Sequence, residues 1–525
     1  MNRFITSVLF GLVTINTMVM ADPTRPRLVV QIVVDQLRTD YVEYLRGLFG
    51  EKGFNRLMKE GTYLRDVDFG VPGLDVASAT AMLATGAWPA DAGIPAANVF
   101  DAKTGKLTPA LHDPSTLGNF TDETYSPARL LLSTVSDELA IDGAGLAAVY
   151  SIAGTPQQAV ILAGHAGNSA VWLNANTGKW ASSAYYGDMP VSASQRNHRQ
   201  PLSQRADTMQ WKPALDLKRY PGIPAHKRQY AFRYTFPTSD RDVYRRLIAS
   251  PLGNREITSL AADYLTNMKL GQRGDVIDML SIGLTAAPFK YVSDGDYRLE
   301  LQDTYLRLDA DLGRLLDVID STAGLDNTLV ILTSTGYYDD ATPDDPKYRI
   351  PSGEFSTRRA VSLLNSYLSA KYGNGNYVSA FADGALYLDH RTLESARVDS
   401  KEAIALAREF LCKMSGVRGA TTLDEILSGA THEAELLRRR VLPSGAADIY
   451  VDFAPGWNVA DETTYPPTVK PVRSSTVSTP AFLMGPSVPV STVSTPVDAT
   501  TLAPTVTQVL RIRSPNGSTG RPRVL

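Results

Sequence analysis

The 525-residue sequence has very little cysteine and histidine, and this scarcity limits the sites that it can build. Cys412 is the only cysteine, so an intrachain disulfide and a cysteine-based zinc site are both excluded. Histidine occurs six times, and no two histidines lie within four residues of each other; they are His112, His165, His198, His226, His390 and His432. The sequence therefore offers no local histidine pair for a metal ion.

A strong charge of one sign is also absent. The formal net charge is −3 and there is no long basic run, so electrostatics give no reason to expect nucleic acid as a partner. The hydrophobic content of 43% and charged content of 20% are ordinary for a globular protein. The length is sufficient for one large core with a sizeable insertion.

The first 21 residues are typical of an export signal. Met1–Arg3 is a charged start, an apolar run follows at 4–13, and Val19–Ala21 fits a small-residue cleavage site. The run is short for a bilayer span, although an uncleaved anchor is the alternative interpretation. No cysteine follows, which argues against a bacterial lipid anchor. We expect a mature chain that starts at Asp22, is periplasmic or secreted, and has no stable membrane span.

Strand and helix patterns alternate through most of the chain. They predict strands at 27–35, 147–152, 158–162 and 329–332, and helices at 41–60, 131–140 and 303–319. Such alternation is typical of a layered α/β fold with a mostly parallel sheet. The polar stretch at about 185–273 is interpreted as a cap insertion in a single domain spanning 22–525. The tract at 472–501 is loop-like by composition, except for a strand-like piece at 481–484.

Two predicted strands end in residues with different chemical properties. The first ends in Asp35, whereas the strand at 329–332 leads into Thr335 and Gly336. In open α/β sheets the functional groups lie just beyond the carboxyl ends of the strands. A metal hydrolase would place several Asp and His side chains there, and here only the first strand ends in a candidate ligand.

Several segments, in order along the chain, carry a resemblance to one family. They are Val33–Tyr41, Thr85–Ala90 with Gly93 and Ile94, Asn98, Ser136–Leu139, Ile161–Ala166, Thr177–Trp180, Asp303–Asp309, Pro455–Trp457 and Pro515–Gly517. Through them the chain resembles the alkaline phosphatase superfamily, in particular the monomeric periplasmic branch related to type I phosphodiesterases and nucleotide pyrophosphatases. The resemblance runs from about residue 25 to 525 and implies an alkaline-phosphatase-like α/β/α sandwich.

The resemblance also implies a set of functional positions. Members of the family hydrolyse phosphate esters with two zinc ions, a Ser or Thr nucleophile, about six Asp and His ligands and cationic phosphate contacts. Asp35 matches the first metal ligand and Asn98 a phosphate-contacting Asn. The other positions carry unsuitable side chains: Val76 for the nucleophile, Thr155 and Gln157 for the phosphate-binding Lys and Arg, and Pro288, Val292, Thr335, Gly336 and Ser478 for the remaining metal ligands.

With one of about six ligands retained, a dizinc centre and a bound cofactor are not expected. Asp35 then has an alternative role in capping a helix or bonding backbone at the strand end, and His165 is interpreted as a core or loop histidine. Asp339, Asp340, Asp344 and Asp345 could suggest a hard-cation site, but without the spacing of a calcium loop they favour a solvated loop.

The leading hypothesis is an exported pseudophosphatase with a binding or scaffolding role, whose partner is an unknown envelope protein or glycan. One alternative is an active phosphate- or sulfate-ester hydrolase with a rearranged centre, built from Asp35, a hydroxyl of Ser78 or Thr80, and acids of the 339–345 segment. A second alternative is a carbohydrate-binding protein that uses aromatic faces of Trp180, Tyr185 and Tyr186, unless these are core residues.

Overall fold

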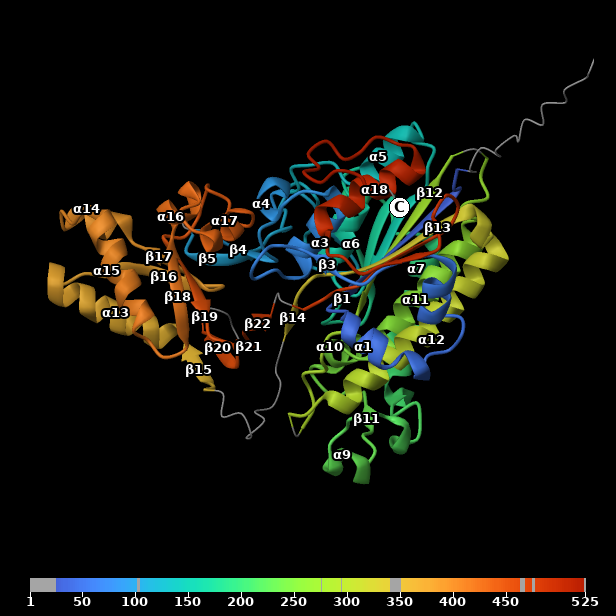
Figure 1. The fold of residues 1–525 in the computed structure, drawn as a ribbon, viewed down its shortest axis with the longest axis horizontal. Coiled ribbons are helices and arrows are strands. Elements are labelled where there is room, and N and C mark those ends of the chain that lie inside the picture. Colours follow the sequence, from blue (N-terminus) through green and yellow to red (C-terminus); the bar gives the residue numbers. More distant parts are fainter. Residues whose placement is uncertain are drawn as a thin grey trace, which may run out of the picture.

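A ten-stranded sheet forms the centre of the protein in a computed structural model (Figure 1). The structure describes residues 25–101, 104–274, 276–293, 295–339, 351–462, 468–474 and 477–523. In spatial order the strands are β24 (Ser491–Val493), β2 (Thr62–Leu64), β23 (Ala481–Met484), β13 (Thr328–Ser334), β1 (Leu28–Asp35), β12 (Asp278–Thr285), β7 (Val149–Ala153), β8 (Ser169–Leu173), β9 (Trp180–Ser183) and β6 (Gly118–Asn119). The five strands from β13 to β8 are parallel, so their carboxyl ends share one edge.

Helices cover both faces of the sheet, as Figure 1 shows. One face packs against α2 (Phe54–Glu60), α11 (Pro251–Asn267) and α12 (Arg298–Thr322). The other packs against α3 (Val76–Thr85), α5 (Val135–Asp142), α6 (Pro156–Ala163) and α18 (Leu502–Leu510). The central strands are buried on both sides, which explains their continuous apolar runs. The predicted layered α/β/α fold is confirmed.

Local signals account for most of the element boundaries near the sheet edge. The Asp75 side chain caps α3, and Thr155 caps α6 with Pro156 in its first turn. The prediction of a strand at 158–162 is therefore wrong. Residues 158–163 are buried on every side, so the apolar run has no periodicity that distinguishes a helix from a strand.

The polar stretch predicted as a cap is only partly an insertion. Its short elements are α7 (Val191–Arg199), α8 (Leu202–Arg205), β10 (Gln210–Trp211), α9 (Ala225–Gln229), β11 (Tyr234–Thr235) and α10 (Val243–Ile248). Of these, α9 and β11 project beyond the sheet (Figure 1), whereas α7 and α10 pack against α11. Helix α11 lies inside the predicted range of 185–273, yet its apolar side packs into the main core. The Asp303 carboxylate of α12 anchors the polar stretch to the main core, because it accepts from Trp211 Nε1 at 2.6 Å and from the Tyr220 hydroxyl at 2.5 Å.

A second lobe, formed mainly by 353–474, was not predicted from the sequence. Its four-stranded sheet has the order β16 (Val378–Ala382), β17 (Ala385–Leu388), β19 (Ile449–Phe453), β18 (Val417–Thr422), and beside it lie β15 (Gly353–Ser356), β20 (Trp457–Asp461) and β21 (Thr468–Pro471). Its helices are α13 (Thr357–Tyr372), α14 (His390–Ser395), α15 (Ser400–Cys412), α16 (Leu423–Ser428) and α17 (His432–Arg438). The lobe has a hydrophobic core of its own.

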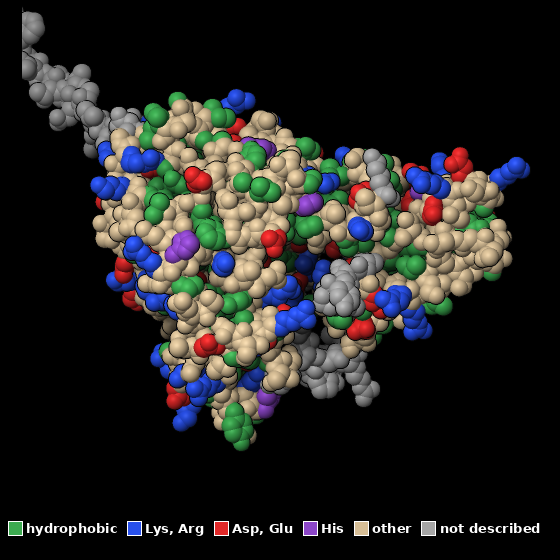
Figure 2. All heavy atoms as spheres, turned by 180° about the vertical axis from the view of Figure 1, so that it is seen from behind, with side chains coloured by type: hydrophobic (Ala, Val, Ile, Leu, Met, Phe, Trp, Pro, Cys, Tyr) green, Lys and Arg blue, Asp and Glu red, His purple; other side chains and the backbone are tan. Residues whose placement is uncertain are grey.

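The second lobe contacts loops near the sheet edge. The Arg439 guanidinium donates to the carbonyl oxygen of Gly70 at 2.9 Å, and Arg440 Nε donates to that of Pro95 at 3.0 Å. The rings of Phe100 and Tyr387 pack with their centroids 4.3 Å apart; Phe100 belongs to the hairpin of β4 (Asn98–Asp101) and β5 (Lys106–Pro109). Figure 2 shows the two lobes meeting across a hollow, beside which Lys and Arg side chains gather.

The predicted export signal at 1–21 lies outside the described residues, so it stays a prediction. Within the described ranges, no helix is long and apolar enough to cross a bilayer.

Candidate functional site

The candidate site lies at the shared carboxyl edge of β13, β1, β12 and β7. Asp35 is the last residue of β1 and pairs in register with Thr285, the last residue of β12. Thr335 and Gly336 follow β13 directly. The topology thus brings together the strand ends that the sequence singled out.

Two hydroxyl groups hold the Asp35 carboxylate. Thr335 Oγ1 donates to Asp35 Oδ1 at 2.9 Å, and the Tyr337 hydroxyl donates to the same oxygen at 2.7 Å. Burial raises the pKa of the Asp35 carboxyl to about 6, even though both hydroxyls and the charge of Arg473 favour the ionised form. The Asp35 carboxylate, which the resemblance would assign to a metal ion, is therefore bonded to neutral hydroxyl groups.

Gly336 has no room for a side chain. Its φ of 71° is in the left-handed region, and a Cβ placed on it would lie 2.1 Å from Cδ2 of Phe69. Phe69 follows β3 (Val67–Asp68), is 4% exposed, and packs in one core with Tyr337. An aromatic ring thus occupies the space into which a ligand side chain at position 336 would extend.

Beside Asp35 lies Asp339, whose two cationic partners, Lys290 and Arg473, sequence reasoning missed. Asp339 of β14 (Tyr338–Asp339) accepts from Lys290 Nζ at 2.8 Å and from Arg473 Nε of β22 (Arg473–Ser474) at 3.0 Å. These two cations hold the pKa of Asp339 below its usual value although burial acts in the opposite direction. The Arg473 guanidinium also lies 4.9 Å from the centre of the Tyr337 ring.

For Asp339, these two ion pairs argue against both predicted interpretations, a hard-cation site and a solvated loop. Asp339 is 5% exposed and bonded to two basic side chains, not oriented toward solvent in a loop. The other acids of that alternative, Asp340, Asp344 and Asp345, lie outside the described residues.

The remaining predicted ligand positions lie after β12 and before β23. Pro288 is buried and Val292 partly buried in the segment between β12 and α12, which Phe289 anchors to the ring of Trp211. The Ser478 side chain is exposed, and its carbonyl oxygen accepts from the backbone N–H of Thr39 at 3.0 Å. Pro and Val cannot ligate a metal through their side chains.

The hydroxyls considered as substitute nucleophiles are engaged inside α3. Val76 is the first residue of the helix, whereas Ser78 and Thr80 are fully buried. Ser78 Oγ donates to Asp75 Oδ1 at 2.9 Å, and Thr80 Oγ1 donates to the carbonyl oxygen of Val76. Neither hydroxyl is free to attack a substrate at the position of Val76.

An open cavity of about 400 Å³ remains next to these groups. Val76, Thr155, Gln157 and Asp35 line part of it. Asn98, the predicted phosphate contact, is not among its lining residues and stands exposed at the start of β4. The structure therefore brings Val76, Thr155 and Gln157 together and leaves Asn98 outside.

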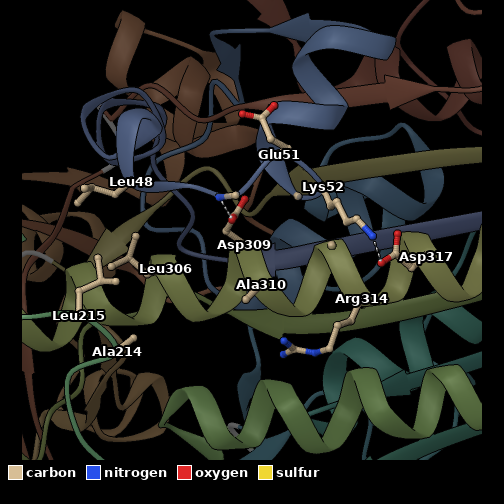
Figure 3. Close-up of a pocket in the computed structure, with 13 residues that line it drawn as sticks. Leu48, Glu51, Lys52, Ala214, Leu215, Leu306, Asp309, Ala310, Arg314 and Asp317 are labelled. Atoms are coloured by element: carbon tan, nitrogen blue, oxygen red, sulfur yellow. Dashed lines mark hydrogen bonds and ion pairs between the residues drawn. The ribbon is translucent and has the colours of Figure 1, made fainter.

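A larger depression of about 590 Å³ lies elsewhere, between α12 and the loop before α2 (Figure 3). Leu48, Leu215 and Leu306 form its apolar part, and Lys52 pairs with Asp317 on its rim. None of the predicted site residues lines it.

The predicted aromatic surface is mostly core. Trp180 is 4% exposed, and the Tyr186 hydroxyl donates to the carbonyl oxygen of Gly164 at 2.8 Å. Only Tyr185, 43% exposed, offers a ring face to solvent. His165 is held in place, with Nδ1 3.1 Å from Asp137 Oδ2 and Nε2 2.9 Å from the carbonyl oxygen of Leu130. It fits the structural role predicted for it.

These residues do not fit a pair of zinc ions. Among the described residues no group of three or more His, Cys, Asp or Glu side chains could hold a metal ion. At the sheet edge itself, the potential ligand Asp35 is bonded to hydroxyls, and Asp339 to Arg473 and Lys290. The donor set, by its chemistry, lacks the imidazoles and carboxylates that such a centre needs.

The sequence matches a known protein family. A sequence model of the family "Type I phosphodiesterase / nucleotide pyrophosphatase" matches residues 29–478. The chain belongs to this family. The predicted relationship to the alkaline phosphatase superfamily is thereby confirmed.

Relatives of this type I phosphodiesterase family member match nearly the full chain. A protein named calcium-transporting ATPase from Myroides odoratus is 28% identical, over 95% of this chain and 94% of its own length. Alkaline phosphatase PafA from Elizabethkingia meningoseptica is 26% identical, over 98% and 97%. The crystal structure of wild-type PafA superposes with a TM-score of 0.82 at 25% identity, covering 95% of this chain and 98% of that one.

Proposed function

We propose that this family member does not hydrolyse phosphate esters through a dizinc centre and instead serves as a binding protein of the cell envelope. The observation that carries the proposal is the Phe69 ring in the space beside Gly336. A ligand at position 336 could coordinate a metal only if that buried ring moved away. The substitution of the other positions by Pro, Val, Thr and Ser agrees with this.

Electrostatics support the same proposal. A dizinc site is a cluster of carboxylates whose mutual repulsion the metal ions neutralise. Here the two acids nearest the edge are satisfied within the protein, Asp35 by two hydroxyls and Asp339 by two cations. Both acids therefore have hydrogen-bond partners within the protein without a metal ion.

A binding role follows from what remains open. The cavity beside Val76 persists although no nucleophile lines it at that position, so the protein retains a recess of a size that suits a small ligand. The proposed location in the envelope rests on the leader-like residues at 1–21 and the absence of a cysteine after them.

The alternative of a rearranged hydrolase requires a free nucleophile and a new set of ligands. The internal hydrogen bonds of Ser78 and Thr80 argue against the first requirement. Asp340, Asp344 and Asp345 could still contribute to the second, so the experiment must measure metal content and turnover together.

The test uses the purified mature chain, loaded with excess Zn²⁺ and then desalted. Elemental analysis should find less than one zinc per chain, and hydrolysis of an aryl phosphate, an aryl phosphodiester and an aryl sulfate should not exceed the buffer rate. Asp35→Ala should behave like the unmodified chain, and Asp91→Ala, an exposed acid on α4 (Pro89–Ala92), is the matched control. Zinc-dependent turnover that chelation and Asp35→Ala both abolish would refute the proposal.

A further inference from the structure

The cavity beside Val76 has features that define the kind of ligand it accepts; this inference rests on the proposed function. It is bounded by the first residues of α3 and α6 and by the carboxyl ends of β7, β8 and β12. The first turns of two helices thus reach its wall. Helix N-termini usually attract anions, because their first backbone N–H groups lack partners.

Both of these N-termini are already capped from within the chain. At α3, Asp75 Oδ1 accepts from the backbone N–H groups of Ala77 and Ser78 at 3.1 and 3.0 Å. Its second oxygen accepts from the N–H of Ala97 at 2.6 Å. Two N–H groups of the first turn of α3 are therefore bonded to a carboxylate that is 7% exposed, which disfavours an anion beside Val76.

The N-terminus of α6 is capped in a neutral way. Pro156 has no N–H, and Thr155 Oγ1 accepts from the N–H of Gln158 at 3.3 Å. Neither Thr155 nor Gln157 carries a charge. A phosphate group that entered here would find no cation at this helix and a carboxylate at the other.

The charged side chains of the wall also disfavour an anion. Asp35, Glu123 and Arg245 are the ionisable acids and bases among the lining residues that the structure describes, which gives a formal charge of −1 when both acids are ionised. Arg245 is exposed and donates to Asn176 Oδ1 at 2.7 Å, so its charge is directed in part outside the cavity. Burying a phosphate dianion in such surroundings without a paired cation is costly.

Hydrogen bonds within the protein already use part of the acceptor capacity of the two acids, which weakens the contacts that a cationic ligand could make. Asp35 Oδ1 accepts two hydroxyl protons. Glu123 Oε2 accepts from Trp172 Nε1 at 3.0 Å and from Asn174 Nδ2 at 3.1 Å. What remains for a ligand is the neutral hydrogen-bonding capacity of Thr155 and Gln157 and the acceptor capacity of Glu123.

Apolar and aromatic groups complete the wall. Trp172 and Tyr125 lie edge to face with their centroids 6.0 Å apart, and Leu173, Ile248 and Ile257 also line the cavity. Trp172 is 1% exposed and offers no ring face, but the partly buried Tyr125 ring and the aliphatic side chains lie beside amide, hydroxyl and carboxylate groups. This combination suits a molecule with apolar C–H surfaces and several hydroxyls.

We propose that this cavity binds a small, uncharged, polyhydroxylated ligand of the size of a hexose and rejects phosphorylated ligands. Sugar hydroxyls both donate and accept hydrogen bonds, so they can match Gln157, Thr155 and the free acceptor capacity of Glu123 without bringing a charge into the cavity. A phosphate group on the same sugar cannot be matched, because the adjacent helix N-termini are already capped.

The test compares neutral sugars with their phosphates on the full mature chain. Saturation-transfer NMR is recorded with a panel of methyl hexopyranosides and with the corresponding hexose 6-phosphates. At least one neutral sugar should bind saturably, and no 6-phosphate should bind more tightly than its neutral partner. If no member of the neutral panel binds, or if a 6-phosphate binds more tightly, the ligand assignment is wrong.

Two substitutions at one position sharpen the result. Gln157→Leu removes the amide and should weaken the sugar by about three- to tenfold, the effect of one lost hydrogen bond. Gln157→Arg adds a cation and should raise the affinity for the 6-phosphate by at least about tenfold. Asp91→Asn, which is exposed and not among the lining residues, is the control that should change neither. Thermal melts confirm that each variant is folded.

Failure here is distinguishable from failure of the proposed function. Absent sugar binding in a chain that also holds no zinc and hydrolyses nothing would overturn the ligand class alone. Zinc-dependent hydrolysis would overturn the proposed function, whichever sugars bind.

Discussion

At the carboxyl ends of β1 and β13 side chains fill the sheet edge, whereas beside the first turns of α3 and α6 a cavity of about 400 Å³ remains open. The filled half contains Gly336 and the Phe69 ring, the open half contains Val76 and Gln157, and Asp35 lies where the two halves meet, on the wall of the cavity. Of the acids near this edge that the structure describes, Asp35 and Asp339 both have partners inside the protein. In the second half neutral side chains stand around free space.

The difference indicates that the two halves have different physical requirements. A carboxylate at a buried edge needs a nearby group that compensates its charge. Replacing or neutralising such a carboxylate is therefore coupled to changes in the packing around it. A nucleophile or a phosphate contact on the wall of an open recess can be replaced without repacking, because solvent fills the difference. Substitutions in the filled half should therefore affect stability strongly, and those in the open half weakly.

The largest effect is expected at the packed contact between Gly336 and Phe69. Gly336→Ala introduces a Cβ that would meet the Phe69 ring, at a φ of 71° that favours glycine. We expect a loss of about 3 kcal/mol in the free energy of unfolding, from overpacking and backbone strain together. Urea denaturation of the purified variant measures it.

A double-mutant cycle isolates the steric part of that loss. Phe69→Ala alone should cost about 3–5 kcal/mol, because it removes a buried ring. The double variant should be more stable than the sum predicts by about 1–2 kcal/mol, since the alanine methyl then finds space. Strict additivity would show that the ring does not fill the space beside position 336.

The sequence predicted the frame of this edge well. Strands β1 and β13 and helix α12 are long, regular patterns with clear ends, so β1, β13 and most of α12 were identified. The second lobe was missed because its strands are short and its sheet is antiparallel, with helices between them. Part of the loop-like tract also forms short strands, namely β22, β24 and β25 (Val497–Asp498).

The filling of the site could not be predicted from local patterns. Phe69 and Arg473 reach the edge from segments that are distant in sequence from Asp35, and nothing in their immediate neighbours indicates that destination. A signal did exist in Gly336, because a glycine directly after a buried strand often marks close approach by another group. The identity of that group required the structure.

A smaller, pH-dependent effect is expected at Asp35. Its folded pKa of about 6 exceeds the ordinary value of 3.8, so the folded state binds the proton more tightly than the unfolded state does. The associated stability is fully present below about pH 4, falls as the pH rises toward 6, and is absent above that. The difference corresponds to about 3 kcal/mol at most, and we expect about 2 because Asp35 is partly exposed.

Asp35→Asn should remove this pH dependence. The asparagine oxygen can still accept from Tyr337 and Thr335, but it carries no charge. At pH 7 the variant should equal or exceed the unmodified chain by up to about 2 kcal/mol, and between pH 4 and 6 its stability should be flatter. Melting curves across this range measure the effect, with Asp91→Asn as the control. A lower stability of Asp35→Asn at pH 7 would contradict the interpretation.

The smallest effect is expected in the open half, at Val76. Val76→Thr keeps the shape of the side chain and places a hydroxyl at the wall of the cavity, where water can reach it, so unfolding should change by less than about 1 kcal/mol. The variant should also gain no hydrolysis of an aryl phosphate with or without Zn²⁺. A serine or threonine hydroxyl attacks only when a base or a metal ion lowers the cost of removing its proton, and the adjacent acid, Asp75, is engaged by the backbone N–H groups of Ala77, Ser78 and Ala97. If the threonine variant acquired zinc-dependent turnover, a metal centre would have to exist beside the cavity, and the contrast between a filled and an open half would no longer hold.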